Sequence, residues 1–212
     1  AIAPGVLAEE AAALDVPLIH YSTDYVFDGS KPTAYDEDDV PNPLGVYGRS
    51  KLAGEQAIAA VGGKHLILRT SWVYSLHGRN FLLTMQRLLQ EREQLSVVAD
   101  QIGAPTWAGS IAAATGQLID RWQTAQTAAW GVYHFTARGE TSWFGFTEAI
   151  ATQLLAQGKP VAQLTAIAPR EYPTPAQRPL NSRLDCTRLE RDWGVSLPDW
   201  HDGLLQCLNS PR

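Results

Sequence analysis

Tyr47 and Lys51 are the pair in this 212-residue sequence whose types and spacing most directly suggest chemistry. They belong to the segment Tyr-Gly-Arg-Ser-Lys, and a spacing of four places both side chains on one face of a helix. A nearby ammonium favours the phenolate form of a tyrosine, which makes that tyrosine a usable general acid or base. The alternative interpretation is an exposed aromatic ring beside a solvated lysine, because this spacing often occurs by chance.

A polar segment upstream supplies a context for this pair. Residues 16–21 form a short apolar run, typical of a buried parallel strand, and Ser22, Thr23 and Asp24 follow it. Ligands of doubly wound sheets bind outside the carboxyl ends of the strands. A hydroxyl there can hydrogen-bond a substrate carbonyl oxygen while a tyrosine protonates it, as hydride delivery to the carbonyl carbon requires. Alternatively, these residues only cap and turn the chain.

A second buried strand, predicted over residues 65–73, ends in an aromatic segment. The run Arg-Thr-Ser-Trp-Val-Tyr places Trp72 at that end. A large aromatic ring there would wall the same crevice, and a tryptophan in the hydrophobic core is the alternative.

The element between the two strands must position the Tyr47–Lys51 pair. We predict a helix from about residue 46 to residue 60, which ends at Gly62 and Gly63. Strand, helix and strand then form a right-handed parallel βαβ unit, so the fold class is α/β. A helix over residues 1–14 precedes it, and residues 29–43 form a surface loop rich in Pro, Asp and Glu.

The rest of the chain alternates in the same way before the pattern loosens. Further elements are predicted as follows: helices over 81–91, 110–122 and 143–155, strands over 95–98 and 131–136, and a turn over 100–106. Residues 169–184 contain four prolines, too many for regular structure, so we expect a shaped loop.

Composition excludes several classes of protein. Hydrophobic residues make up 45% and charged residues 18%, as in ordinary globular chains rather than disordered ones. The net charge of 17 − 22 = −5 argues against a nucleic-acid partner. Cys186 and Cys207 have no disulfide-framework or zinc spacing, and we find neither a long apolar run nor a signal sequence. We therefore expect a cytoplasmic protein with no membrane partner.

Five motifs in combination resemble the dTDP-4-dehydrorhamnose reductase family, part of the extended short-chain dehydrogenase/reductase superfamily. In chain order they are Ser-Thr-Asp-Tyr-Val-Phe-Asp-Gly at 22–29, Tyr-Gly-Arg-Ser-Lys at 47–51, Leu-Arg-Thr-Ser-Trp-Val-Tyr at 68–74, Asp-Gln-Ile-Gly-Ala-Pro-Thr at 100–106, and Tyr-Pro-Thr-Pro-Ala-Gln-Arg-Pro-Leu-Asn-Ser at 172–182. Tyr-x-x-x-Lys identifies only the superfamily. The first and last motifs together are far more specific.

The resemblance implies an activity and roles for particular residues. The activity is reduction of the C4 keto group of dTDP-6-deoxy-L-lyxo-4-hexulose by NADPH or NADH, which gives dTDP-L-rhamnose. By similarity, Tyr47 is the proton donor, Lys51 holds the nicotinamide ribose, and Thr23 hydrogen-bonds the reacting oxygen. The other implied contacts are Tyr21 with the cofactor and Asp24, Trp72, Asn80 and Arg178 with the sugar nucleotide.

The sequence departs from the family pattern at its start. None of the 17 glycines forms the Gly-rich turn that holds a cofactor pyrophosphate at a helix N-terminus. We therefore expect an N-terminally truncated chain that contains the C-terminal part of a doubly wound, Rossmann-like parallel sheet. Such a chain should bind cofactor weakly or not at all, be inactive alone, and expose a strand edge that favours an artefactual homodimer.

The resemblance also predicts a division into two domains. Residues 1–75 and about 99–136 would be the remaining dinucleotide-binding domain. Residues about 76–98 and 137–212 would form a smaller mixed α/β substrate-binding domain.

The residues after the 100–106 turn bear on metal binding. Some members of the family are described as joining subunits through Mg²⁺ bound by carboxylates soon after the 100–106 turn, but residues 107–115 contain no Asp or Glu. We therefore predict no metal. Alternative functions are a nucleotide-sugar epimerase or dehydratase of the same superfamily, and a non-catalytic regulatory subunit similar to that of methionine adenosyltransferase.

Overall fold

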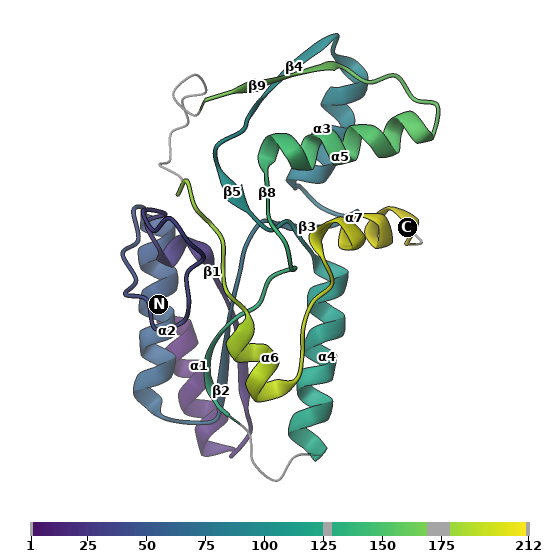
Figure 1. Ribbon diagram of the computed structural model, residues 1–212. Coiled ribbons are helices and arrows are strands. Elements are labelled where there is room, and N and C mark those ends of the chain that lie inside the picture. Colours follow the sequence, from purple (N-terminus) through teal and green to yellow (C-terminus); the bar gives the residue numbers. More distant parts are fainter. Residues whose placement is uncertain (1, 125–128, 169–178, 211–212) are drawn as a thin grey trace.

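The main sheet consists of three parallel strands in the order β1 (Leu18–Thr23), β2 (His65–Thr70) and β7 (Gly131–His134) (Figure 1). The computed structural model describes residues 2–124, 129–168 and 179–210. Leu18 lies opposite His65 and Thr23 lies opposite Thr70, so β1 and β2 end at the same level. The predicted α/β class and its parallel sheet are confirmed.

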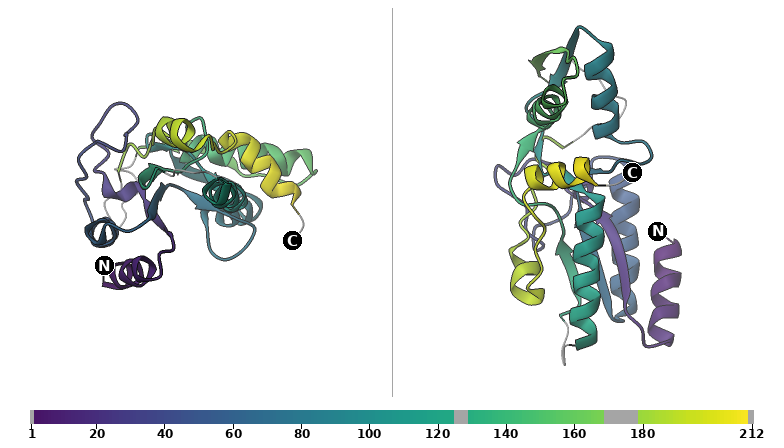
Figure 2. Two further views of the ribbon diagram at one scale, coloured as in Figure 1. Left: turned by 90° about the horizontal axis from the view of Figure 1, so that it is seen from below. Right: turned by 90° about the vertical axis from the view of Figure 1, so that its right-hand side faces the viewer.

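Helices cover both faces of this sheet (Figure 2). On one face α1 (Ile2–Ala13) packs against α2 (Val46–Val61), and Ala8, Ile58 and Ile67 share a small apolar cluster there. On the other face lie α4 (Ala108–Thr124) and α6 (Thr187–Trp193). Leu118 of α4 and Leu189 of α6 are fully buried there in one cluster with strand residues.

A further hydrophobic cluster lies beyond the carboxyl ends of the strands. It is built from α3 (Phe81–Glu91), β4 (Gln94–Val98), α5 (Trp143–Ala156) and α7 (Trp200–Asn209). β4 pairs in parallel with β9 (Gln163–Ile167). Two short strand pairs lie between the clusters: β3 (Val73–Tyr74) with β6 (Thr106–Trp107), and β5 (Ile102–Gly103) with β8 (Thr141–Ser142).

The observed bounds correct the predicted ones at several places. The strand predicted over 16–21 starts at Leu18 and continues through Thr23, because pairing with β2 extends to Thr70. The strand predicted over 65–73 ends at Thr70, and β3 follows separately. β9, α6 and α7 were not predicted. Although α6 lies within the range assigned to the substrate-binding domain, it packs on the main sheet; the domain boundaries themselves stay a prediction.

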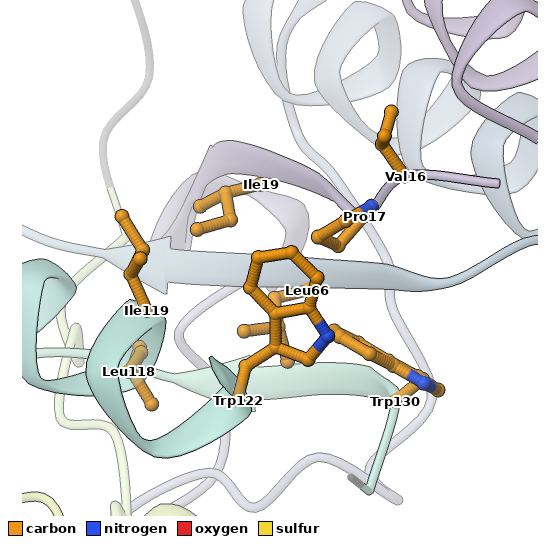
Figure 3. Close-up of a pocket in the computed structure, with 8 residues that line it drawn as sticks. All are labelled: Val16, Pro17, Ile19, Leu66, Leu118, Ile119, Trp122 and Trp130. Carbon is orange, nitrogen blue, oxygen red and sulfur yellow. The ribbon is translucent and has the colours of Figure 1, made fainter. Parts of the chain in front are cut away.

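β1 lies at the edge of the three-stranded sheet, and a hollow opens beside its first residues (Figure 3). The hollow has a volume of about 300 Å³ and an apolar lining. Its walls are Val16, Pro17, Ile19, Leu66, Leu118, Ile119, Trp122 and Trp130. It therefore lies at the end of β1 opposite to Thr23, away from the residues predicted to do chemistry.

Two kinds of feature are missing from the part of the chain that the structure describes. None of its helices has both the length and the apolar character needed to cross a membrane. Nor are three or more His, Cys, Asp or Glu side chains gathered there where they could hold a metal ion.

Candidate active site

Thr23 is the last residue of β1, and its side chain caps the short helix η1 (Asp24–Val26) that follows. The Thr23 hydroxyl oxygen accepts a hydrogen bond from the backbone N–H of Tyr25 at 3.2 Å. The same hydroxyl donates to Asp24 Oδ1 at 3.0 Å. Thr23 therefore caps η1 and also lies at the carboxyl edge of the sheet. Its capping role does not exclude a role of its hydroxyl in catalysis.

Asp24 is a buried carboxyl beside this hydroxyl. Its side chain is 3% exposed, and burial raises its pKa to about 6. Hydrogen bonds from Ser182 and Thr23 and from backbone N–H groups oppose this rise without cancelling it. A carboxyl that titrates near neutrality at a strand end is typical of a functional site.

α2 brings Tyr47 to the same strand end. The helix begins at Val46 after Gly45 and ends at Gly62, whose left-handed φ of 72° is readily adopted by glycine. Gly48 allows a close approach to η1, because a Cβ on it would lie 2.1 Å from the carbonyl oxygen of Tyr25. The Tyr47 ring meets the Tyr25 ring edge to face with 5.8 Å between centroids, and Tyr47 remains 57% exposed.

Lys51, one turn further along α2, reaches back to β1. Its Nζ donates to the backbone oxygen of Tyr21 at 2.5 Å and lies 3.5 Å from Nε2 of His20. Burial lowers the pKa of Lys51, and the Glu55 carboxylate opposes that effect. Burial, and then the Lys51 charge, lower the pKa of His20, so the neutral ring can accept from the ammonium.

Tyr21, the predicted cofactor contact, is exposed on the edge strand. Its hydroxyl lies 2.7 Å from Oγ1 of Thr115 on α4. Because the Thr115 hydroxyl donates to the carbonyl oxygen of Ile111, Tyr21 is the donor in this bond. Its side chain is therefore tied to α4 while its backbone oxygen holds Lys51.

Trp72 follows β2 and adopts a backbone conformation that is unusual for a residue with a side chain. Its φ is 49°, in the left-handed region, where strain is often associated with function. The ring stacks on Trp143 at the start of α5, with centroids 3.6 Å apart and planes 11° apart. A Cβ on Gly103 would lie 2.8 Å from the Trp72 ring, so this glycine gives the ring its space.

Glu55, a further turn along α2, is anchored to the sheet. Its carboxylate accepts two hydrogen bonds from Nε of Arg69 and one from Nη2. Both side chains are buried. Residues 47, 51 and 55 share one helix face, so this ion pair fixes the face that carries Tyr47 and Lys51.

Asn80, another predicted substrate contact, makes its side-chain hydrogen bonds with residues close to it in sequence. Asn80 caps α3: its Oδ1 accepts from the backbone N–H of Leu83 at 3.2 Å. Its Nδ2 donates to the carbonyl oxygens of Ser75 and His77, so both ends of the amide are already bonded. Arg178 lies outside the described residues.

Sequence reasoning missed His20, Glu55 and Trp143 as parts of the site. Glu55 could have been found, because it continues the four-residue spacing of Tyr47 and Lys51. The contacts of His20 with Lys51 and of Trp143 with Trp72 join residues 31 and 71 positions apart, and no local pattern signals them.

Comparison with known proteins decides the family. The family described as RmlD substrate binding domain matches residues 1–212. A dTDP-4-dehydrorhamnose reductase of Sinorhizobium fredii is 47% identical over 197 residues, which cover 92% of this chain and 67% of that protein. This chain belongs to the dTDP-4-dehydrorhamnose reductase family. A second member of the family, from Burkholderia thailandensis, is 45% identical over 97% of this chain and 72% of its own length.

A solved structure of the same family agrees with the fold. The dTDP-4-dehydrorhamnose reductase of Bacillus anthracis, crystallised in complex with NADP, superposes with a TM-score of 0.88 at 36% identity. The match covers 98% of this chain and 70% of that one. The resemblance inferred from the five motifs is confirmed at the level of the family.

Proposed function

We propose that this chain carries the proton-donating and substrate-binding groups for reduction of the C4 keto group of dTDP-6-deoxy-L-lyxo-4-hexulose to dTDP-L-rhamnose, with NADPH or NADH as reductant. The observation that carries the proposal is how α2 brackets Thr23. Tyr47 contacts Tyr25, two residues after Thr23, and Lys51 is bonded to Tyr21, two residues before it. A donor, a cation and a hydroxyl thus converge on one strand end.

The roles follow from these positions. Tyr47, which is exposed, donates its phenolic proton to the C4 oxygen, and Thr23 hydrogen-bonds the same oxygen. Such bonds count most where charge develops on that oxygen. Lys51 keeps a positive charge beside the tyrosine.

The cofactor fits the residues present at its nicotinamide end. An ammonium has three N–H groups, and only Tyr21 and His20 accept from Lys51 within the described structure, so one N–H remains for a ribose hydroxyl. The ring of Tyr21 is exposed beside it. When bound, NAD(P)H supplies the hydride. The relative from B. anthracis, crystallised with NADP, supports this choice of cofactor.

Trp72 and Asp24 remain our proposed contacts for the sugar nucleotide, with Asn80 and Arg178 as weaker candidates. Trp72 offers an apolar ring just after the carboxyl end of β2, and its strained backbone is consistent with a functional position. An amide and a guanidinium suit sugar hydroxyls and a diphosphate.

The chain by itself should bind the cofactor weakly. Its sequence lacks a Gly-rich pyrophosphate turn, and β1 lies at the edge of the described sheet. The open edge is also the surface through which we propose that two copies associate. Titration of NADPH into the chain, followed by fluorescence, tests the first point, with a family member that carries a Gly-rich turn as the reference; tight binding by the chain would contradict it.

The activity is tested with the protein as its own cells make it, NADPH and the 4-keto sugar nucleotide, with product analysis over several dTDP- and UDP-sugars. We expect dTDP-L-rhamnose, and loss of turnover in Tyr47→Phe. Tyr133→Phe is the matched control, because it removes a hydroxyl that bonds Ala129 and Asp192 on the far side of the sheet. Unchanged turnover in Tyr47→Phe, or an epimerised or dehydrated product, would refute the proposal.

A further inference from the structure

We propose that Asp24 is a positioning residue whose protonation decides whether the Thr23 hydroxyl can donate to the reacting oxygen. The inference rests on the proposed function, in which Thr23 meets that oxygen. It adds a control element that neither the motif nor the family assignment contains. It is based on the hydrogen bonds among the Thr23 hydroxyl, the Asp24 carboxyl and the backbone N–H of Tyr25.

The Thr23 hydroxyl has a single proton, and its two neighbours determine where that proton can go. It is donated to Asp24 Oδ1 at 3.0 Å, while the hydroxyl oxygen accepts from the N–H of Tyr25 at 3.2 Å. An ionised carboxyl can only accept hydrogen bonds. With Asp24 ionised, Thr23 therefore has no proton left for a substrate oxygen.

Protonation of Asp24 reverses this bond. The carboxylic acid can donate to the Thr23 oxygen, whose two lone pairs accommodate both the acid and the N–H of Tyr25. The Thr23 proton is then free to be donated to the C4 oxygen. No proton leaves Asp24 or Thr23 in the reaction: hydride adds to the carbon, the proton of Tyr47 goes to the oxygen, and Asp24 ends the cycle as it began.

The surroundings of Asp24 favour its neutral form. The carboxyl is buried at the carboxyl end of β1, and the neighbours with the largest effect on its pKa are all uncharged: the hydroxyls of Ser182 and Thr23 and two backbone N–H groups. The titratable groups on the face of α2 that carries Tyr47 are Tyr47, Lys51 and Glu55, and Glu55 is paired with Arg69. A bound sugar nucleotide excludes further water and so pushes the carboxyl in the same direction.

The test is the pH dependence of kcat for the protein as its own cells make it, from pH 5 to pH 9 with saturating substrates. Since one ordinary hydrogen bond corresponds to about a tenfold change in rate, kcat should fall about tenfold as the pH rises through the pKa of Asp24. The step should fall on kcat, because the bond to the C4 oxygen matters most in the transition state, whereas a direct contact of Asp24 with the sugar nucleotide would add a separate change in KM. Thr23→Ser keeps a hydroxyl and should keep this step in the profile.

Two variants should lose the step. In Thr23→Val no hydroxyl is left to be switched, and in Asp24→Asn no proton can be gained or lost at position 24. A step that persists in either variant would overturn the inference. If Asp24→Asn does not fold, as judged by circular dichroism, the comparison of Thr23→Ser with Thr23→Val still decides. Absence of turnover in the wild type would instead refute the proposed function, so the two failures are distinguishable.

Discussion

Glu55 on α2 and Arg69 on β2 form a bidentate ion pair in the interior of the protein, with 2.7 Å between Oε2 and Nη2 and 3.1 Å between Oε1 and Nε. The two residues are 3% and 4% exposed. Because Glu55 lies one turn beyond Lys51, this pair fixes the rotation of α2 on the sheet. The face of the helix that carries Tyr47 and Lys51 is thus held by an ion pair in which neither of these two side chains takes part.

Glu55→Gln should destabilise the protein strongly. It leaves the Arg69 guanidinium buried without an anionic partner, and breaking one side of a buried pair costs about 3–5 kcal/mol of unfolding free energy. Urea denaturation measures the loss. The double variant Glu55→Met with Arg69→Met should lose clearly less unfolding free energy than the sum of the losses in Glu55→Met alone and Arg69→Met alone. Additive losses would show that the two side chains are not coupled.

Gly48→Ala should separate α2 from η1. The added Cβ would lie 2.1 Å from a backbone oxygen, which cannot rotate away, so the helix must move. We expect kcat to fall at least about tenfold, because small displacements of catalytic groups are costly, and stability to fall by about 1–3 kcal/mol.

Gly116→Ala is the control for this change. Gly116 also lies inside a helix, α4, but a Cβ there meets nothing within 4 Å. That substitution should leave kcat unchanged and raise stability by up to about 1 kcal/mol. Equal behaviour of the two alanine variants would contradict the role that we assign to Gly48.

Asn80 can be tested for a structural and a binding role at once. Asn80→Ala removes the cap of α3 and should cost about 1 kcal/mol, measured by thermal unfolding. Asn80→Asp keeps the capping oxygen but puts an oxygen in place of the Nδ2 that donates to Ser75 and His77, so it should restore only part of that stability. If Asn80 also contacts the sugar nucleotide, both variants raise KM; a KM unchanged in Asn80→Asp would restrict the residue to its cap.

His134 should make the protein sensitive to acid. Burial, and then the charge of Arg69, lower its pKa to about 3, whereas in the unfolded chain it titrates near 6.5. The folded state therefore holds a neutral ring that the unfolded state would protonate, so stability falls as the pH drops from about 6.5 toward 3. The loss amounts to roughly 3 kcal/mol between pH 7 and pH 4.

The matching experiment compares the pH dependence of unfolding free energy in two variants. His134→Gln should flatten the acid slope, whereas His201→Gln, at an exposed position of α7, should leave it in place. A slope that survives in His134→Gln would assign the acid sensitivity to other groups.

Local patterns predicted the elements that repeat a simple period. The first strand, predicted over 16–21 and observed at Leu18–Thr23, the helix that carries Tyr47 and the parallel pairing with β2 follow from apolar runs and glycine stops. β9 and α6 escaped prediction. β9 has an irregular burial pattern, and α6 has only seven residues, so neither shows a clear period.

The site was predictable in its residue types but not in its contacts. The motifs pointed to Thr23, Tyr47 and Lys51, which the fold gathers at one strand end. The buried state of Asp24 depends on the chain packed around it, including Ser182, more than 150 positions away. Long-range packing of this kind leaves no trace in the spacing of neighbouring residues.

The parallel pairing of β4 with β9 has a consequence for synthesis of the chain on the ribosome. β1, α2 and β2 can assemble as soon as residue 70 has emerged, but β4 finds its partner only after residue 163 has been made. Meanwhile the apolar side chains of Leu95 and Val97, which are buried in the finished protein, have no completed sheet to join. The apolar side chains of β4 therefore stay without their partner strand for longer during synthesis than those of β1 and β2.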